Sequence, residues 1–186
     1  MHKELKLKDT LYHGTISELK TIDMNKGRGY RDFGKGFYLA YRKDQAIKMM
    51  HKRAREAEGR TKNIKKENIK IIKRLYTFKT NSEALKELNV KIFEEADIQW
   101  LDFILKCRKC EGTPHSYDIV IGPTADDDTA YCLNMYNEGA YGPVNSIKAK
   151  SVLLNNLEVE NYGTQVFIGT ARGLSILASV EKEIYN

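Results

Sequence analysis

Long apolar runs are missing from this sequence, and their absence excludes a membrane-spanning helix. The longest uninterrupted runs hold only a few residues, whereas a helix needs roughly 20 to cross a bilayer. Residues 1–8 are charged rather than apolar, so we expect no signal peptide. Cysteine is scarce as well: Cys107, Cys110 and Cys132 are an odd number in a chain of 186 residues, which is too long to depend on disulfide staples. We therefore expect a cytoplasmic protein that makes no contact with a membrane.

The sequence also lacks the usual signatures of metal and phosphate sites. Cys107 and Cys110 have the spacing of a zinc-ligand pair, but the spacings to His115 and Cys132 fit no structural zinc site, so we expect no metal. There is no GxxxxGK[ST] phosphate loop. The segment Gly34-Lys35-Gly36 precedes an expected strand instead of following one, which argues against a Rossmann dinucleotide fold.

Hydrophobic residues make up 41% of the sequence, which is enough to build the core of one domain spanning residues 1–186. Its net charge of +6 is concentrated between Arg42 and Arg74. Such a stretch can hold a nucleic acid or an acidic protein, but it lacks the interleaved aromatic residues that stack on bases. We favour a solvated helix face and loop.

Apolar periodicity and turn residues predict an α+β domain with a split or strongly curved sheet. The expected strands span residues 10–14, 36–40, 69–80, 90–93, 117–121, 164–168 and 178–184. The expected helices span residues 44–58, 82–88, 96–110, 146–154 and 171–177, and one more begins at Asp126-Asp127-Asp128. In the first of them, Asp44 is the expected cap and Gly59 the expected stop. We expect the strand 117–121 to be buried on both faces because it is continuously apolar and β-branched.

Three segments carry candidate chemistry: Leu11-Tyr12-His13-Gly14-Thr15, Phe33-Gly34-Lys35-Gly36-Phe37-Tyr38-Leu39-Ala40, and Gln165-Val166-Phe167-Ile168. The first two resemble the NAD-binding core of the ADP-ribosyltransferases of the diphtheria-toxin and poly(ADP-ribose) polymerase branch. A closer resemblance is to a group of uncharacterised bacterial proteins of that superfamily, whose pattern Asp-Phe-Gly-Lys-Gly-Phe-Tyr-Leu is matched by residues 32–39. The resemblance extends from about residue 11 to residue 177.

This resemblance implies an ADP-ribosyltransferase-like split sheet that binds NAD as a substrate. The backbone of Gly14 would pair with the nicotinamide carboxamide, and His13 would hydrogen-bond a ribose hydroxyl. The ring of Tyr38 would pack on the nicotinamide, a contact worth about 0.5 to 1.5 kcal/mol beyond area burial. The implied catalytic residues are His13, Tyr38 and Gln165, and the implied NAD-binding residues are His13, Gly14, Thr15, Phe37, Tyr38 and Met49.

Two positions depart from the pattern of the active transferases. Met49 stands where a second tyrosine closes the other side of the nicotinamide, and Gln165 stands where the active enzymes carry a glutamate. Cleavage of the nicotinamide–ribose bond builds positive charge on the sugar. A carboxylate about 4 Å away at an effective dielectric near 20 is worth about 4 kcal/mol, or roughly a thousandfold in rate, and a glutamine lacks that charge. Whether Glu160 or Asp126 substitutes for it stays open.

The expected function is NAD-dependent mono-ADP-ribosylation of a protein or nucleic-acid acceptor, because the resemblance implies that the missing glutamate disfavours polymer elongation. In bacteria such small domains are often toxins or effectors, so an antitoxin-like protein is among the implied partners. One alternative is a pseudoenzyme that binds NAD or ADP-ribose without turnover, which Met49 and Gln165 favour. Another is a nucleic-acid-processing relative of the same fold, which the basic stretch favours.

Overall fold

A computed structural model describes residues 6–64, 71–125, 129–157 and 163–185. Seven strands form one mixed sheet in the order β4-β5-β6-β2-β1-β3-β7, in which β4 and β5 are parallel and the other neighbours are antiparallel. The strands are β1 (Thr10–Thr15), β2 (Phe37–Ala40), β3 (Lys73–Thr80), β4 (Val90–Ile92), β5 (Ile119–Pro123), β6 (Thr164–Ile168) and β7 (Leu177–Tyr185). The chain is therefore an α+β protein, as predicted.

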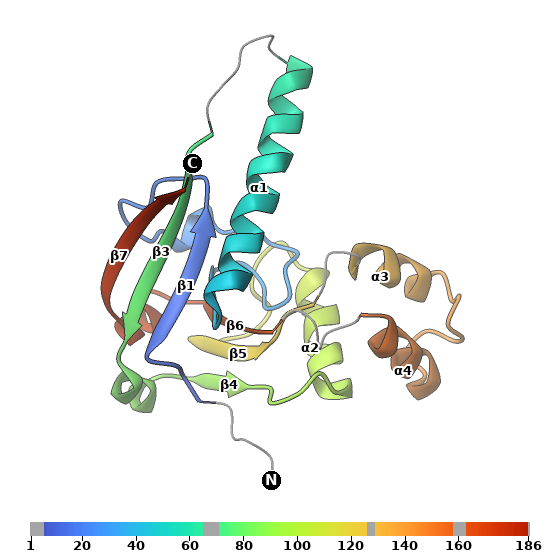
Figure 1. The fold of residues 1–186 in the computed structure, drawn as a ribbon. Coiled ribbons are helices and arrows are strands. Elements are labelled where there is room, and N and C mark those ends of the chain that lie inside the picture. Colours follow the sequence, from blue (N-terminus) through green and yellow to red (C-terminus); the bar gives the residue numbers. More distant parts are fainter. Residues whose placement is uncertain (1–5, 65–70, 126–128, 158–162, 186) are drawn as a thin grey trace.

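In the described residues, four α-helices flank this sheet: α1 (Lys43–Ile64), α2 (Ile98–Arg108), α3 (Thr129–Asn137) and α4 (Ile147–Asn156). Short 3₁₀ helices are η1 (Met24–Lys26), η2 (Ser82–Glu87) and η4 (Arg172–Ile176). Figure 1 shows β1, β3 and β7 running steeply, with α1 alongside, while β4, β5 and β6 run across them beside α2. The sheet is thus strongly curved, and α1 and the group of α2, α3 and α4 flank different parts of it.

Apolar side chains divide into two cores on opposite faces of the sheet. The first, the helix-face core, includes Val120 and Phe167 and the buried faces of α2, α3 and α4. The second includes Ile119 and Ile121. Alternate residues of β5 thus enter different cores, which confirms that this strand is buried on both faces.

Local sequence explains where two of the helices begin. In α2 the Oδ1 atom of Asp97 accepts a hydrogen bond from the Trp100 amide at 2.8 Å, and the buried stripe of the helix includes Trp100 and Leu101. In α4 the N-cap is Ser146, whose Oγ accepts from Ala149 N at 3.2 Å. Helices were expected at residues 96–110, from apolar spacing, and at residues 146–154, and both expectations are confirmed.

The end of α1 corrects a prediction. Gly59 does not stop the helix, which continues to Ile64. Glycine favours the end of a helix where the chain adopts the left-handed conformation. In the interior of a helix, an exposed glycine lowers helix stability by only about 1 kcal/mol relative to alanine, so the helix can continue through it. Asp44 lies in the first turn, where its carboxylate pairs with Arg42.

Other boundaries shift by a few residues or lie outside the described parts of the chain. The strand expected from residue 69 begins at Lys73, and residues 69 and 70 are outside the described residues. Residues 126–128, expected to begin a helix, are also outside them, and α3 is described from Thr129. Within the described ranges, no helix combines the length and apolar character that spanning a membrane requires.

Candidate functional site

The junction between β1 and β2 is the shortest strand pairing in the sheet. Only Tyr12 and Ala40 are in register there. On its other edge β1 pairs with β3 from Thr10 to Thr15, and β2 pairs along its length with β6. Next to this pair, the side chain of His13 lies within hydrogen-bond distance of the carbonyl of Tyr38. The two halves of the sheet meet where the expected NAD motif lies.

His13 is held in one protonation state and one tautomer. Its Nδ1 lies 2.7 Å from the carbonyl oxygen of Tyr38, which can only accept, so Nδ1 carries the proton and donates. Desolvation, helped by the charge of Arg53, lowers the pKa of His13 from its ordinary 6.5 to about 4, despite the opposing backbone hydrogen bond. At neutral pH the ring is therefore uncharged, and Nε2 is the atom left to accept a hydrogen bond.

Gly14 allows α1 to lie directly on β1. A Cβ at position 14 would lie 1.9 Å from the backbone oxygen of Ala46 and 2.8 Å from Cβ of Met50. The carbonyl of Gly14 accepts a hydrogen bond from Arg53 Nη1 at 3.3 Å. The glycine is thus required by helix packing, and its carbonyl already has a donor beside it.

Arg53 brings positive charge to the junction. Desolvation is the main cause of its lowered pKa, and the charges of Arg31 and Arg28 lower the pKa further, while Glu56 raises it. Among the described residues, no carboxylate lies within 4.0 Å of the Arg53 guanidinium. Arg28 and Arg31 therefore lie close enough to Arg53 to lower its pKa, and we call these three residues the arginine cluster. Such a concentration of positive charge favours an anion.

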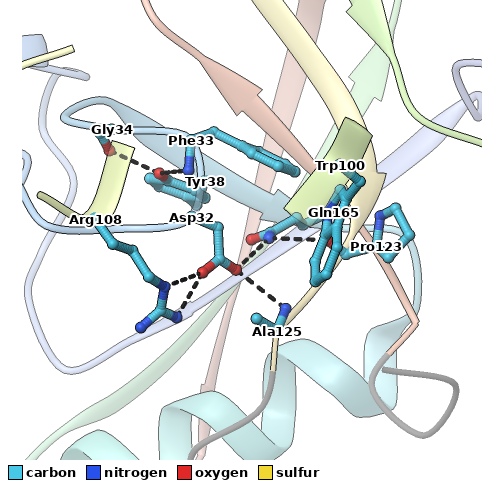
Figure 2. Close-up of polar contacts among 9 residues, drawn as sticks. All are labelled: Asp32, Phe33, Gly34, Tyr38, Trp100, Arg108, Pro123, Ala125 and Gln165. Atoms are coloured by element: carbon cyan, nitrogen blue, oxygen red, sulfur yellow. Dashed lines mark hydrogen bonds and ion pairs between the residues drawn. The ribbon is translucent and has the colours of Figure 1, made fainter. Parts of the chain in front are cut away.

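The side chain of Tyr38 turns to the helix face of the sheet and is tied to the loop 27–36. Its hydroxyl donates to Gly34 O at 2.6 Å and accepts from Phe33 N at 3.1 Å (Figure 2). Its ring packs edge-on against Phe167, with centroids 5.1 Å apart. Desolvation is the main cause of the raised pKa of Tyr38, so the phenol stays protonated. The role of this ring as a platform for nicotinamide stays a prediction.

The other residues expected to bind NAD are divided between the junction and its surroundings. The ring of Phe37 lies against His13 with centroids 4.6 Å apart. Thr15 is buried at the end of β1, whereas Met49 is 39% exposed on α1 and it is Met50 that faces β1. His13, Gly14 and Phe37 thus meet at the junction, while Tyr38 and Gln165 direct their side chains to the helix face.

Asp32 forms a buried polar network with Gln165 that sequence reasoning missed. The Oδ1 atom of Asp32 accepts from Arg108 Nε at 2.8 Å and from Nη2 at 2.5 Å (Figure 2). Its Oδ2 accepts from Gln165 Nε2 at 2.8 Å and from Ala125 N at 3.1 Å. Asp32 is 6% exposed and Gln165 8%. A carboxylate therefore does lie beside position 165, and it comes from the loop 27–36.

Comparison with known families places these residues within one matched segment of the chain. Residues 10–178 match the DUF3990 family, described as proteins of unknown function. The chain belongs to the DUF3990 family. The match includes β1, the loop 27–36, α1 and β6, and so covers the whole β1–β2 junction. No curated protein and no solved structure matches the chain.

The DUF3990 chain also has a pocket away from the junction. It has a volume of about 310 Å³ and is lined by residues that include Phe103, Lys106 and His115. Nε2 of His115 donates to Phe33 O at 2.9 Å, and its Nδ1 accepts from Tyr117 N at 3.2 Å. Nε2 thus holds the loop 27–36, whereas Nδ1 is used by the backbone of Tyr117. None of the expected NAD-binding residues lines this pocket.

The remaining candidates from the sequence form no site in the described residues. Within these ranges no group of three or more histidine, cysteine or acidic side chains is placed to hold a metal ion. Cys107 and Cys132 are buried. Glu160 and residues 126–128, the other candidate carboxylates, lie outside the described residues.

The pairing of Asp32 with Arg108 gives a prediction for stability. Arg108→Met should lower the free energy of unfolding by about 3 kcal/mol, because it leaves a carboxylate that is 6% exposed without its cation. Urea denaturation measures the change. As a control, Lys86→Met removes an ion pair to Glu83 whose two side chains are largely exposed, and it should change stability little. Equal effects of the two substitutions would contradict the prediction.

Proposed function

We propose that this protein is an NAD-dependent mono-ADP-ribosyltransferase that transfers ADP-ribose to a protein or nucleic-acid acceptor. The observation that carries the proposal is the β1–β2 junction, where the neutral His13 lies close to Arg53 of the arginine cluster. The family resemblance of the segments around His13 and Tyr38 gives the ligand its identity. The proposal includes the finer fold, an ADP-ribosyltransferase-like split sheet, which the single residue pair between β1 and β2 supports.

The chemistry of NAD fits these groups. Nε2 of His13 would accept a hydrogen bond from a ribose hydroxyl, because Nδ1 is committed to Tyr38 O. The guanidinium of Arg53, with Arg28 and Arg31 nearby, would face the pyrophosphate, whose two negative charges would relieve the mutual repulsion of the arginines. A ligand at this junction would thus meet an acceptor for its sugar and cations for its phosphates.

In the proposed reaction the bond between nicotinamide nitrogen and ribose C1′ breaks. The electron pair of that bond leaves with nicotinamide, which becomes neutral. A nucleophilic atom of the acceptor forms the new bond to C1′ from the opposite side and loses its proton to solvent. Gln165 would orient the ribose during this step, and the lack of a glutamate there favours a single transfer over chain building.

Arg53→Gln should raise the Kd for NAD about tenfold, because it removes a charge-assisted contact worth about 1.5 kcal/mol or more. It should also weaken the dependence of Kd on salt concentration. Arg55→Gln is the matched control, since Arg55 is an exposed side chain of the same helix. Isothermal titration at two salt concentrations measures both effects. If the two variants bound NAD equally well, the arginine cluster would not be the phosphate site.

The function itself is tested by release of nicotinamide from NAD, with and without cell lysate, together with the thermal shift caused by NAD. Release that depends on lysate supports a transferase with a macromolecular acceptor. A thermal shift without release identifies an NAD-binding pseudoenzyme, which is the main alternative. If NAD causes no thermal shift and no nicotinamide is released, both the transferase and the pseudoenzyme are contradicted.

A second candidate, binding of a nucleic acid, is favoured by the shape and charge of α1. This helix extends past the end of β1 (Figure 1), and its Lys48, Arg55 and Arg60 are exposed. A complex with RNA or DNA that weakens steeply with salt in a gel-shift assay would support it. No shift at low salt would rule it out.

A further inference from the structure

The starting point is the way in which Asp32 constrains the amide of Gln165. Paired with Arg108, the carboxylate of Asp32 is ionised and can only accept hydrogen bonds. It therefore requires an NH₂ group, not a carbonyl, on the Gln165 atom 2.8 Å away. The same nitrogen lies 3.4 Å from the carbonyl of Pro123, another group that can only accept.

The surroundings reinforce this orientation. Trp100 Nε1 donates to the same Pro123 carbonyl at 3.2 Å, and Ala125 N donates to Asp32 at 3.1 Å (Figure 2). The two acceptors around Gln165, Asp32 and the Pro123 carbonyl, are thus held by donors from α2 and from the residues at and after the end of β5. With both amide hydrogens directed at acceptors, only the carbonyl oxygen Oε1 of Gln165 is left to meet a ligand.

We propose that Asp32 is a positioning residue of the transferase site, which orients and polarises Gln165 so that Oε1 accepts a hydrogen bond from the ribose of NAD. The proposal rests on the proposed function of the protein. Oε1 then takes the hydrogen-bonding role that a glutamate oxygen has in the active transferases. An amide that donates a hydrogen bond to an anion gains negative charge on its oxygen. Asp32 thus makes Oε1 of Gln165 more negative, which partly replaces the charge of the glutamate that the active transferases carry at this position.

The arrangement predicts that the carboxylate and the amide can be exchanged. Gln165→Glu alone places two carboxylates about 2.8 Å apart beside one arginine, so it should lower kcat at least tenfold. Asp32→Asn alone removes the anion that orients the amide and should lower kcat about tenfold. The double variant Asp32→Asn/Gln165→Glu restores one carboxylate and one amide. Its kcat should return to within about threefold of the wild type or exceed it.

Nicotinamide release gives kcat and KM for the four proteins, and thermal unfolding measures their stability. Recovery of kcat in the double variant supports the proposal. Recovery of the melting temperature without recovery of kcat overturns it, because the network would then serve only to hold the loop 27–36. A single Gln165→Glu variant that equals the wild type in kcat also overturns it.

One further variant covers the case in which Gln165→Glu does not fold. Gln165→Met keeps the length of the side chain and removes Oε1 without adding charge. It should lower kcat by about the same factor as Asp32→Asn, and the combination of both should lower kcat no further. Additive losses would overturn the proposal. A wild type that neither binds NAD nor releases nicotinamide refutes the proposed function, whereas an active wild type with additive losses refutes only the role of Asp32.

Discussion

Gly14→Ala is expected to lower the free energy of unfolding by about 3 kcal/mol or more. The added Cβ would lie 1.9 Å from the carbonyl oxygen of Ala46 and 2.8 Å from the carbonyl carbon. Both are backbone atoms of α1, so no side-chain rotation relieves the overlap and the helix itself has to move off β1. Chemical denaturation of the variant measures the loss.

Gly59→Ala is the matched control for this substitution. Gly59 lies in the same helix, α1, but away from the sheet. Outside the helix's own backbone, no atom lies within 4 Å of a Cβ built at this position. Alanine has the higher helix propensity, so this variant should be more stable than the wild type by up to about 1 kcal/mol. Losses of similar size at both positions would mean that α1 does not pack on β1 as described.

His13→Gln is expected to lower kcat/KM for nicotinamide release from NAD by about tenfold to a hundredfold, the effect of losing a hydrogen bond worth about 1.4 to 2.7 kcal/mol. Glutamine approximates the size of histidine and can still donate to Tyr38 O, but its remaining polar atoms do not reproduce the position of Nε2. His51→Gln on α1 is the control and should keep the wild-type rate. Equal rates for His13→Gln and the wild type would remove His13 from the site.

The pH dependence of the wild type tests the same residue. Because the pKa of His13 is lowered to about 4, Nε2 stays unprotonated until the pH falls through that value. The rate should therefore hardly change between about pH 7.5 and about pH 5.5, and should fall below that as the ring gains a proton. A fall centred near 6.5, the ordinary value for histidine, would show that the ring is solvated.

Several elements could be predicted because their cause is local. The apolar spacing of α2 is a property of a short segment, and the structure has this helix, like the one expected at 146–154, where it was expected. The apolar segment 117–121 predicted a strand buried on both faces for the same reason, and β5 begins within it at Ile119. The stop expected at Gly59 was wrong, since a glycine by itself does not tell whether the residues after it continue the helix.

The candidate site was predictable only in part. Short motifs drew attention to His13, Gly14 and Tyr38, and they do lie around one junction of the sheet. The partner of Gln165 was not predictable, because Asp32 is 133 residues away in sequence and no local pattern connects them. Asp32 is the first residue of the Asp-Phe-Gly-Lys-Gly-Phe-Tyr-Leu motif. An acidic residue next to aromatic residues that are buried was the available signal that Asp32 has a buried partner.

Sequence alone thus determined the class of fold, the approximate positions of most strands and helices, and the histidine and glycine of the junction, because periodicity, capping and short motifs act over a few residues. Tertiary structure alone decided the protonation of His13, the position of Arg53 beside Gly14, and the capture of Gln165 by Asp32 and Arg108. These properties depend on burial and on charges brought together from distant segments, and only the folded chain brings those segments into contact.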